Sequence, residues 1–128
     1  MFKRSQEELK ALGADITTAE IKQQPDLWVS TFGIYQENLS AIKEFVERAR
    51  NLGEGRRTRV VFTGAGTSAY VGDTIAPYLR AYGEKSSFEF ASVATTDIVS
   101  DPYGSLDPDD PTVLVSFARS GNSPESLA

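Results

Sequence analysis

The stretch Val60-Val61-Phe62-Thr63-Gly64-Ala65-Gly66-Thr67-Ser68-Ala69 decides the fold. Its β-branched and aromatic residues predict a buried strand, and its glycines predict a tight turn that leads directly into a helix. Such a junction places backbone N–H groups and short hydroxyls at the N-terminus of the helix, where the helix dipole favours an anion. The stretch therefore predicts an anion-binding turn.

A second stretch near the end of the sequence has the same form. Residues Thr112 to Phe117 predict a strand, and Ala118-Arg119-Ser120-Gly121-Asn122-Ser123-Pro124 predicts a hydroxyl-rich loop that leads into a helix. Ser123 is a suitable helix N-cap, and Pro124 is a suitable first helical residue. We expect the two loops to close on one phosphate group.

The chain between these stretches predicts an α/β fold. A helix is expected from about Thr67 to Tyr82 with Pro77 inside it, and a further strand from Ser87 to Ala91. Strands that alternate with helices form a parallel sheet through right-handed crossovers. Ligands bind at the carboxyl ends of such strands, where loops 64–68, 93–97 and 116–123 are expected.

The N-terminal residues predict helices. Ser5 to Glu8 matches a capping box for a short helix that ends at Gly13, and Thr17 to Glu20 matches a second box for a turn that ends before Pro25. Pro25 is expected to begin a longer helix. One continuous apolar stripe on that helix is expected to pack on a core or a partner subunit: Trp28, Phe32, Tyr35, Leu39, Ile42, Phe45, Val46 and Ala49.

Composition excludes several classes of function. A net charge of −5 over 128 residues argues against general nucleic-acid binding, and no stretch is apolar enough for a membrane span. Because the sequence has no cysteine, disulfides and thiolate metal sites are excluded. With no histidine either, acid–base chemistry would use a carboxylate, Lys or Tyr. We expect no metal and no cofactor, and a cytoplasmic location.

A dinucleotide site is the alternative interpretation of the first loop. Gly64 to Ala69 satisfies the pattern G-x-G-x-x-G/A, and Glu84 or Glu89 lies near the spacing of a ribose-binding acid. A dinucleotide, however, needs neither the hydroxyl of Ser68 nor the second serine loop. No lysine follows the glycines, which excludes a Walker-type phosphate loop.

Three motifs carry a resemblance to a known family: Thr63 to Asp73, Ala94 to Asp97, and Ser116 to Ser126. The region from Thr58 to Ala128 resembles the front part of an SIS (sugar isomerase) domain. More narrowly, the motifs resemble the tagatose-6-phosphate ketose/aldose isomerase family (AgaS), whose complete chains have two SIS domains. The implied fold is a parallel α/β sheet flanked by helices, incomplete in this chain.

This resemblance implies two parts and a longer protein. The parts are an N-terminal helical segment, 1–57, and the front of a phosphosugar-binding SIS domain, 58–128. A five-residue helix at the end of the chain is too short to be stable alone, and a three-stranded parallel sheet needs cover on both faces. We therefore expect the sequence to be the front part of a longer protein. The resemblance also implies a homo-oligomer such as a dimer, because SIS proteins commonly pair their domains.

The resemblance also implies a ligand and the residues that bind it. The ligand is a hexose 6-phosphate or hexosamine 6-phosphate, and its phosphate would be held by Ser68, Ser120 and Ser123. Ala118 replaces the first serine of the Ser-x-Ser-Gly pattern found in many SIS loops. Further candidates for contact with the sugar or for shaping the loops are Gly66, Thr67, Thr95, Gly121 and Asn122.

The implied chemistry is deamination of galactosamine 6-phosphate and isomerisation to tagatose 6-phosphate. It requires proton transfer between C1 and C2 of the sugar, by an acid and a base that are expected beyond residue 128. Asp97 and Glu125 are the only loop carboxylates to consider, but Asp97 is expected to cap a helix and Glu125 to stabilise the dipole at a helix start. The fragment alone is expected to be inactive. A phosphosugar-binding regulatory domain without catalysis, and a Rossmann-type nucleotide binder, remain open as alternatives.

Overall fold

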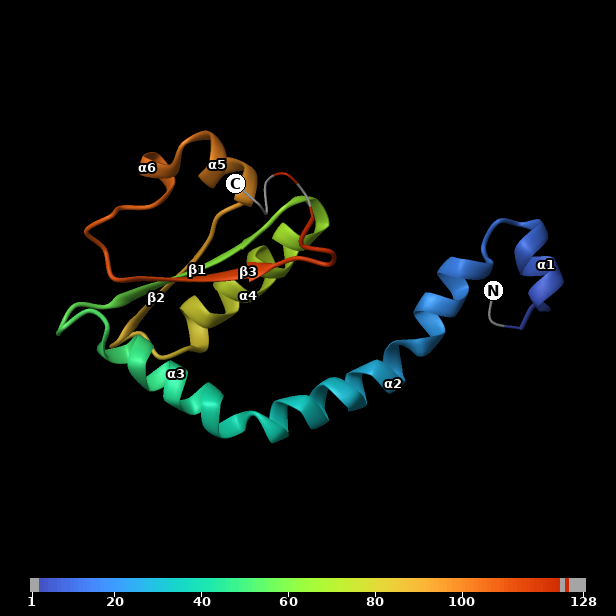
Figure 1. Ribbon diagram of the computed structural model, residues 1–128, viewed down its shortest axis with the longest axis horizontal. Helices are drawn as coiled ribbons and strands as arrows, with labels where there is room; N and C mark the ends of the chain where they lie inside the picture. Colours follow the sequence, from blue (N-terminus) through green and yellow to red (C-terminus); the bar gives the residue numbers. More distant parts are fainter. Residues whose placement is uncertain (1–2, 123, 125–128) are drawn as a thin grey trace. The chain divides into compact units, whose positions relative to one another are not determined.

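The computed structural model describes residues 3–122 and 124, and it divides into two compact units. The first unit, Met1–Lys43, is helical, and the second, Glu44–Ala128, holds the sheet (Figure 1). The helices that supply the first unit are α1 (Gln6–Ala11), α2 (Asp15–Glu37) and the start of α3 (Leu39–Asn51). The division between 1–57 and 58–128 stays a prediction from sequence.

The capping box that opens the first helix is confirmed. The Glu8 backbone N–H donates to Ser5 Oγ at 3.2 Å, and the Ser5 backbone N–H donates to the Glu8 carboxylate at 2.8 Å. Gly13 follows α1 with a φ of +62°, in the left-handed region where a glycine carries no Cβ penalty. Leu9 is buried beneath this turn. Local sequence signals therefore determine the whole of α1.

The second capping box is a wrong prediction. Helix α2 begins at Asp15 and continues through Pro25, so Pro25 lies in its interior rather than in its first turn. The Thr18 hydroxyl donates to the Ala14 carbonyl at 2.6 Å, and Thr18 is buried. Thr17, the predicted cap of this box, lies inside the helix, where the N–H groups that a cap would bind already have backbone partners. The proline removes one backbone donor without ending the helix.

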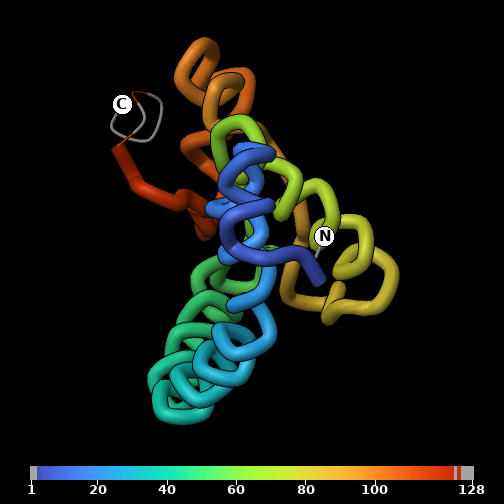
Figure 2. Tube along the Cα trace, turned by 90° about the vertical axis from the view of Figure 1, so that its right-hand side faces the viewer, coloured from blue at the N-terminus to red at the C-terminus, as the bar shows by residue number. Residues whose placement is uncertain are grey.

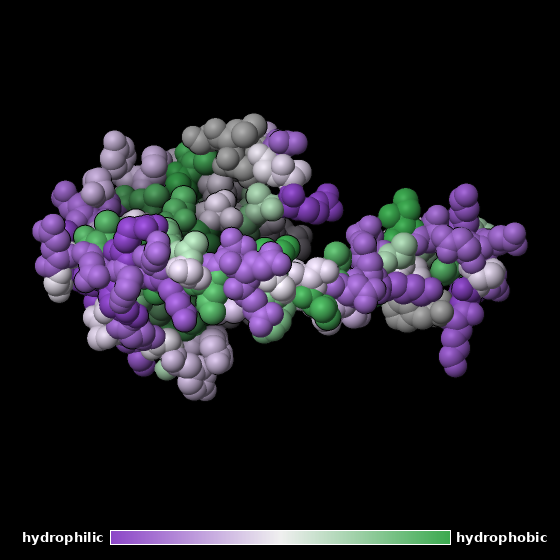
Figure 3. Space-filling model, turned by 60° about the horizontal axis from the view of Figure 1, so that its bottom comes forward, coloured by the Kyte–Doolittle hydropathy of each residue, from purple (hydrophilic) through white to green (hydrophobic). Residues whose placement is uncertain are grey.

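The long helix predicted from Pro25 is likewise two helices, joined at Asn38. The Asn38 side-chain amide donates to the Ile34 carbonyl at 2.8 Å, which competes with the regular backbone pattern at this position. Trp28 is 66% exposed, and the rings of Phe32 and Tyr35 stack at 6.1 Å and are also exposed. In Figure 3, hydrophobic and hydrophilic side chains alternate along the N-terminal helices.

The three predicted strands form one parallel sheet. They are β1 (Thr58–Gly64), β2 (Phe88–Ser92) and β3 (Thr112–Phe117), in the order β2-β1-β3. Val60 on the central strand pairs with Phe90 on one side and with Val113 on the other. The connecting helices are η1 (Gly66–Ser68), α4 (Ala69–Tyr82), α5 (Thr95–Ser100) and α6 (Pro102–Ser105). The expected α/β fold with a parallel sheet is confirmed.

The connections after β1 and after β2 lie on opposite faces of the sheet. On one face, α4 packs so closely that a Cβ on Gly72 would lie 2.9 Å from Phe62 Cβ. On the other face, the Arg59 guanidinium donates to the Ser105 carbonyl of α6 at 3.2 Å. Figure 1 shows α4 below the strands and α5 and α6 above them, and Figure 2 shows the same separation from the side. The direction of the chain across the sheet therefore reverses at β1.

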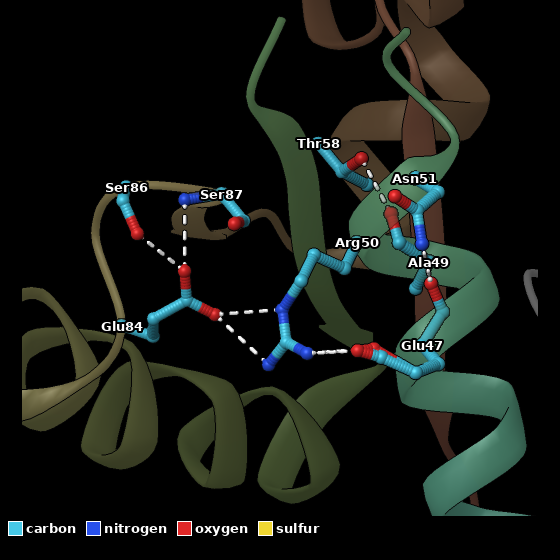
Figure 4. Close-up of polar contacts among 8 residues, drawn as sticks. All are labelled: Glu47, Ala49, Arg50, Asn51, Thr58, Glu84, Ser86 and Ser87. Carbon is cyan, nitrogen blue, oxygen red and sulfur yellow. Dashed lines mark hydrogen bonds and ion pairs between the residues drawn. The ribbon is translucent and has the colours of Figure 1, made fainter. Parts of the chain in front are cut away.

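The end of α3 is fastened to the start of β1 within the second unit (Figure 4). The Thr58 hydroxyl donates to the Ala49 carbonyl at 2.7 Å, and Thr58 is fully buried. An apolar cavity of about 350 Å³ lies next to this contact, among α3, α4 and the sheet, with Arg50 and Glu84 among its lining residues. One buried hydrogen bond thus joins the end of α3 to the start of β1.

An ion-pair network lies beside the same cavity (Figure 4). The Arg50 guanidinium pairs with Glu47 and, at 3.1 Å, with Glu84. Glu84 also accepts hydrogen bonds from the Ser86 hydroxyl and the Ser87 backbone N–H. The Ser86 hydroxyl, the Ser87 N–H and the Arg50 charge together lower the pKa of Glu84 to about 2. The carboxylate form of Glu84 therefore holds the turn that leads into β2.

Candidate functional site

A polar hollow of about 190 Å³ lies where the loops after β1 and β3 meet. The β1 loop contributes Ala65 and Ser68, and the β3 loop contributes residues 117–121. The two loops that the sequence predicts to act together are therefore neighbours in space. In a sheet with this strand order, the β1 and β3 ends form the topological switch point, where ligands of open α/β sheets bind.

Ser68 stands at the start of α4 with a hydroxyl that makes no capping hydrogen bond. The turn before it is tight, because a Cβ on Gly64 would lie only 2.6 Å from the Ser68 carbonyl carbon. Gly66 has a φ of +56°, which favours glycine. The two glycines thus fold the loop back on the end of β1 and bring Ser68 to the hollow.

The second loop turns at Gly121, whose φ is +68°. The Asn122 backbone N–H donates to Ser120 Oγ at 3.4 Å, which closes the turn. Ser120 and Gly121 line the hollow, whereas Asn122 is not among the residues that line it. Ser123 and Glu125 lie outside the described residues, so two of the three predicted phosphate-binding serines can be placed, and both line the same hollow.

A wider hollow of about 540 Å³ adjoins the first. It is lined by Ala65, Thr67, Ser68, Val71 and Arg119. Ala65, Ser68 and Arg119 line both hollows, and Thr67 lines only the wider one. Thr67 therefore shares the wider hollow with Ser68 but not with Ser120.

Thr95 lies at the same edge of the sheet but lines neither hollow. Its Oγ1 is 3.0 Å from Thr63 Oγ1, so the two hydroxyls share a hydrogen bond at the ends of β1 and β2. Its position is therefore that of a support for the loops. The expectation that Asp97 caps a helix is wrong: the N-cap of α5 is Ala94, and Asp97 lies inside the first turn. At that position the positive end of the helix dipole stabilises the negative charge of Asp97.

Sequence reasoning left the direction of Arg119 open and missed some supporting residues. Arg119 lines the site, and Ala65 and Phe117 complete its walls. The Ser92 hydroxyl donates to Asp73 Oδ1 at 2.8 Å, which links the end of β2 to α4. Arg119 could have been chosen from its place in the quoted motif, whereas the link between Asp73 and Ser92 has no local sequence signal.

Within residues 3–122 and 124, no cluster of three or more acidic, histidine or cysteine side chains could hold a metal ion. None of the helices formed by these residues is both long and apolar enough to cross a bilayer.

Solved structures resemble this chain in both fold and sequence. A tagatose-6-phosphate ketose/aldose isomerase from Escherichia coli is 42% identical with a TM-score of 0.73, over 85% of this chain and 28% of that one. A protein from Clostridium novyi NT assigned the same activity is 42% identical with a TM-score of 0.83, over 96% of this chain and 30% of that one. The fold is therefore that of an SIS-type α/β sugar isomerase domain, with N-terminal helices before a parallel sheet.

Among curated proteins, the D-galactosamine-6-phosphate deaminase AgaS of Escherichia coli is 44% identical over 115 residues. The match covers 88% of this chain and 28% of that protein. No protein-family profile matches the chain. The chain is a homologue of AgaS-type galactosamine-6-phosphate deaminases and tagatose-6-phosphate isomerases over their N-terminal part, and it spans less than a third of their length.

Proposed function

We propose that this chain supplies the phosphate-binding loops of an SIS-type enzyme of amino-sugar catabolism. The substrate would be galactosamine 6-phosphate or a tagatose 6-phosphate type of sugar, as the names of its relatives suggest. The single observation that supports the proposal best is that Ser68 and Ser120 line one polar hollow at the switch point of the sheet. We also propose a cytoplasmic location and a homo-oligomer.

The two loops supply suitable chemistry for a phosphate monoester. The hydroxyls of Ser68 and Ser120 can donate to phosphate oxygens, and α4 directs its N-terminal backbone N–H groups toward the same region. Thr67, on the wider hollow, is placed to contact the sugar. Proton transfer between C1 and C2 needs an acid and a base, and no carboxylate lines either hollow among the described residues. We assign that step to residues beyond 128.

Ligand titration tests this proposal. We expect galactosamine 6-phosphate to bind the chain in calorimetry, and unphosphorylated galactosamine to bind far more weakly. Each serine hydroxyl contributes about 1.5–3 kcal/mol if its hydrogen bond is charge-assisted, so the double variant Ser68→Ala/Ser120→Ala should abolish measurable binding. A chain that binds NAD but no phosphosugar would refute the proposal in favour of the nucleotide-binding alternative.

A regulatory domain that binds a phosphosugar without reacting it is the second candidate. It would use the same two loops, because binding a phosphosugar needs only the hydroxyls and helix N-terminus described above. Turnover by the complete protein separates the two functions. Release of ammonia from galactosamine 6-phosphate would establish the enzyme, whereas binding without turnover would establish the regulator. Residues 1–128 alone are expected to give no turnover.

A further inference from the structure

Arg119 holds a particular place between the two hollows. It lies at the end of β3, one residue before Ser120, and it lines both the 190 Å³ and the 540 Å³ hollow. Ala65 and Ser68 are the other two residues with a surface in both, and both come from the opposite loop. A group bound across the two hollows would therefore contact Ser68 on one side and Arg119 on the other.

The described residues that line the two hollows carry a positive charge, whereas the chain as a whole is acidic. The sequence has 18 acidic and 13 basic residues, which gives a net charge of −5. Among the described residues that line the two hollows, however, Arg119 is the only one with an ionised side chain. An acidic chain thus presents one isolated positive charge among hydroxyls and apolar side chains.

The hydroxyls alone do not balance the charge of a phosphate monoester. Such a group carries about −1.5 to −2 charges near pH 7, whereas a helix N-terminus contributes roughly half of one positive charge. Serine hydroxyls donate hydrogen bonds but carry no net charge. Ala118, also in the lining, adds only a methyl group. A full positive charge would complete the balance, and an arginine fork binds two phosphate oxygens at once.

We propose that Arg119 is the charge-binding residue of this site, and that it makes the site select dianionic phosphate esters over neutral sugars and over monoanionic esters. The inference rests on the proposed phosphosugar function. It adds the guanidinium of Arg119 as the group that distinguishes ligands by their charge. The serines then fix the position of the phosphate, while Arg119 determines which charge state binds.

Two substitutions and one matched control test this inference. Arg119→Ala removes the charge, and Arg119→Lys keeps it without the fork geometry. Arg57→Ala is the control, because Arg57 is an exposed arginine just before β1, at the opposite end of the strand, where it pairs with Glu89 at 3.2 Å. Arg119 is itself exposed, so its removal leaves no cavity in the core. Thermal unfolding would verify that all three variants keep the fold.

The measurement is the affinity for galactosamine 6-phosphate, determined by calorimetric titration from pH 5 to pH 8. Arg119→Ala should weaken binding at pH 7.5 by about 10- to 100-fold, the range for losing a charge-assisted hydrogen bond. Arg119→Lys should fall between it and the parent chain, and Arg57→Ala should bind as the parent does. The parent should bind more tightly as the ester loses its second proton near pH 6, and Arg119→Ala should show a much flatter pH dependence.

Two results would overturn the inference. If Arg119→Ala retains the affinity and the pH dependence of the parent while Ser68→Ala loses binding, the charge-reading role is wrong and the phosphosugar function stands. If the parent chain binds no phosphosugar at all, the proposed function fails and the inference fails with it.

Discussion

The Oγ1 atoms of Thr63 and Thr95 lie 3.0 Å apart, where the carboxyl ends of β1 and β2 meet. Thr63 is buried, and it directly precedes the glycine turn of the first loop. This one hydrogen bond ties the central strand to the start of α5. The hydrogen bond therefore stabilises the strand end from which the first loop of the candidate site begins, although neither threonine lines the hollows.

Replacing Thr63 by valine should lower the free energy of unfolding by about 1 kcal/mol, because the Thr95 hydroxyl loses its partner in a partly buried place. Urea unfolding followed by circular dichroism measures the loss. The double variant Thr63→Val/Thr95→Val should be less destabilised than the sum of the two single variants. Strict additivity would mean that the two hydroxyls do not interact.

Gly64→Ala should both destabilise the second unit and impair ligand binding. The new Cβ would lie 2.6 Å from the Ser68 carbonyl carbon, so the turn that brings Ser68 to the hollow must move. Overpacking of this kind costs about 1–3 kcal/mol. Gly33→Ala is the control: nothing lies within 4 Å of its Cβ position inside α2, so it should stabilise the chain by about 0.5–1 kcal/mol. Unchanged phosphosugar affinity in Gly64→Ala would contradict the described turn.

Replacing Pro25 by alanine tests where the second helix begins. In the structure Pro25 lies inside α2, so alanine restores a backbone donor and should raise helicity and stability. Had the helix begun at Pro25, the substitution would bring no such gain, because proline is favoured at the first helical position. Circular dichroism and the fluorescence of Trp28, the single tryptophan, report the change. Gln24→Ala is the control and should have little effect.

Acid should weaken the second unit through Glu84. The pKa of this carboxyl is about 2, below its ordinary value of 4.5, chiefly because of the Ser86 hydroxyl. The unfolded chain therefore takes up this proton first, so the stabilisation is complete above pH 4.5 and is lost as the pH falls toward 2. NMR titration of the Glu84 carboxyl measures the pKa, and Ser86→Ala should raise it. A midpoint near 4.5 in the parent chain would rule out the network.

Local signals explain which parts of the fold could be predicted. The strand bounds agree with the sequence to within a residue, because β-branched or aromatic residues mark each strand, while Gly64 ends β1 and Pro111 precedes β3. The capping box at Ser5 was readable because its partner is three residues away. The second box failed because α2 begins at Asp15, two residues before Thr17, so the predicted cap lies inside the helix.

The candidate site was predictable in its loops but not in its side-chain directions. Glycines and hydroxyls mark both loops, and the parallel sheet brings strand ends to one edge. Whether Arg119 faces solvent or the hollow depends on how β3 lies beside β1, which is a long-range pairing. The link between Ser92 and Asp73 is similarly tertiary and could not be read from either residue alone.

The strand order also has a consequence for how the hollow opens. In the described part of the chain, β1 pairs on both sides and β3 pairs only with β1. Amides of a doubly paired, buried strand exchange with solvent deuterium more slowly than those of an edge strand. One wall of the hollow thus rises from the strand that pairs on both sides within the described residues, and the other rises from β3. Hydrogen exchange at the two strand ends would show which wall opens first.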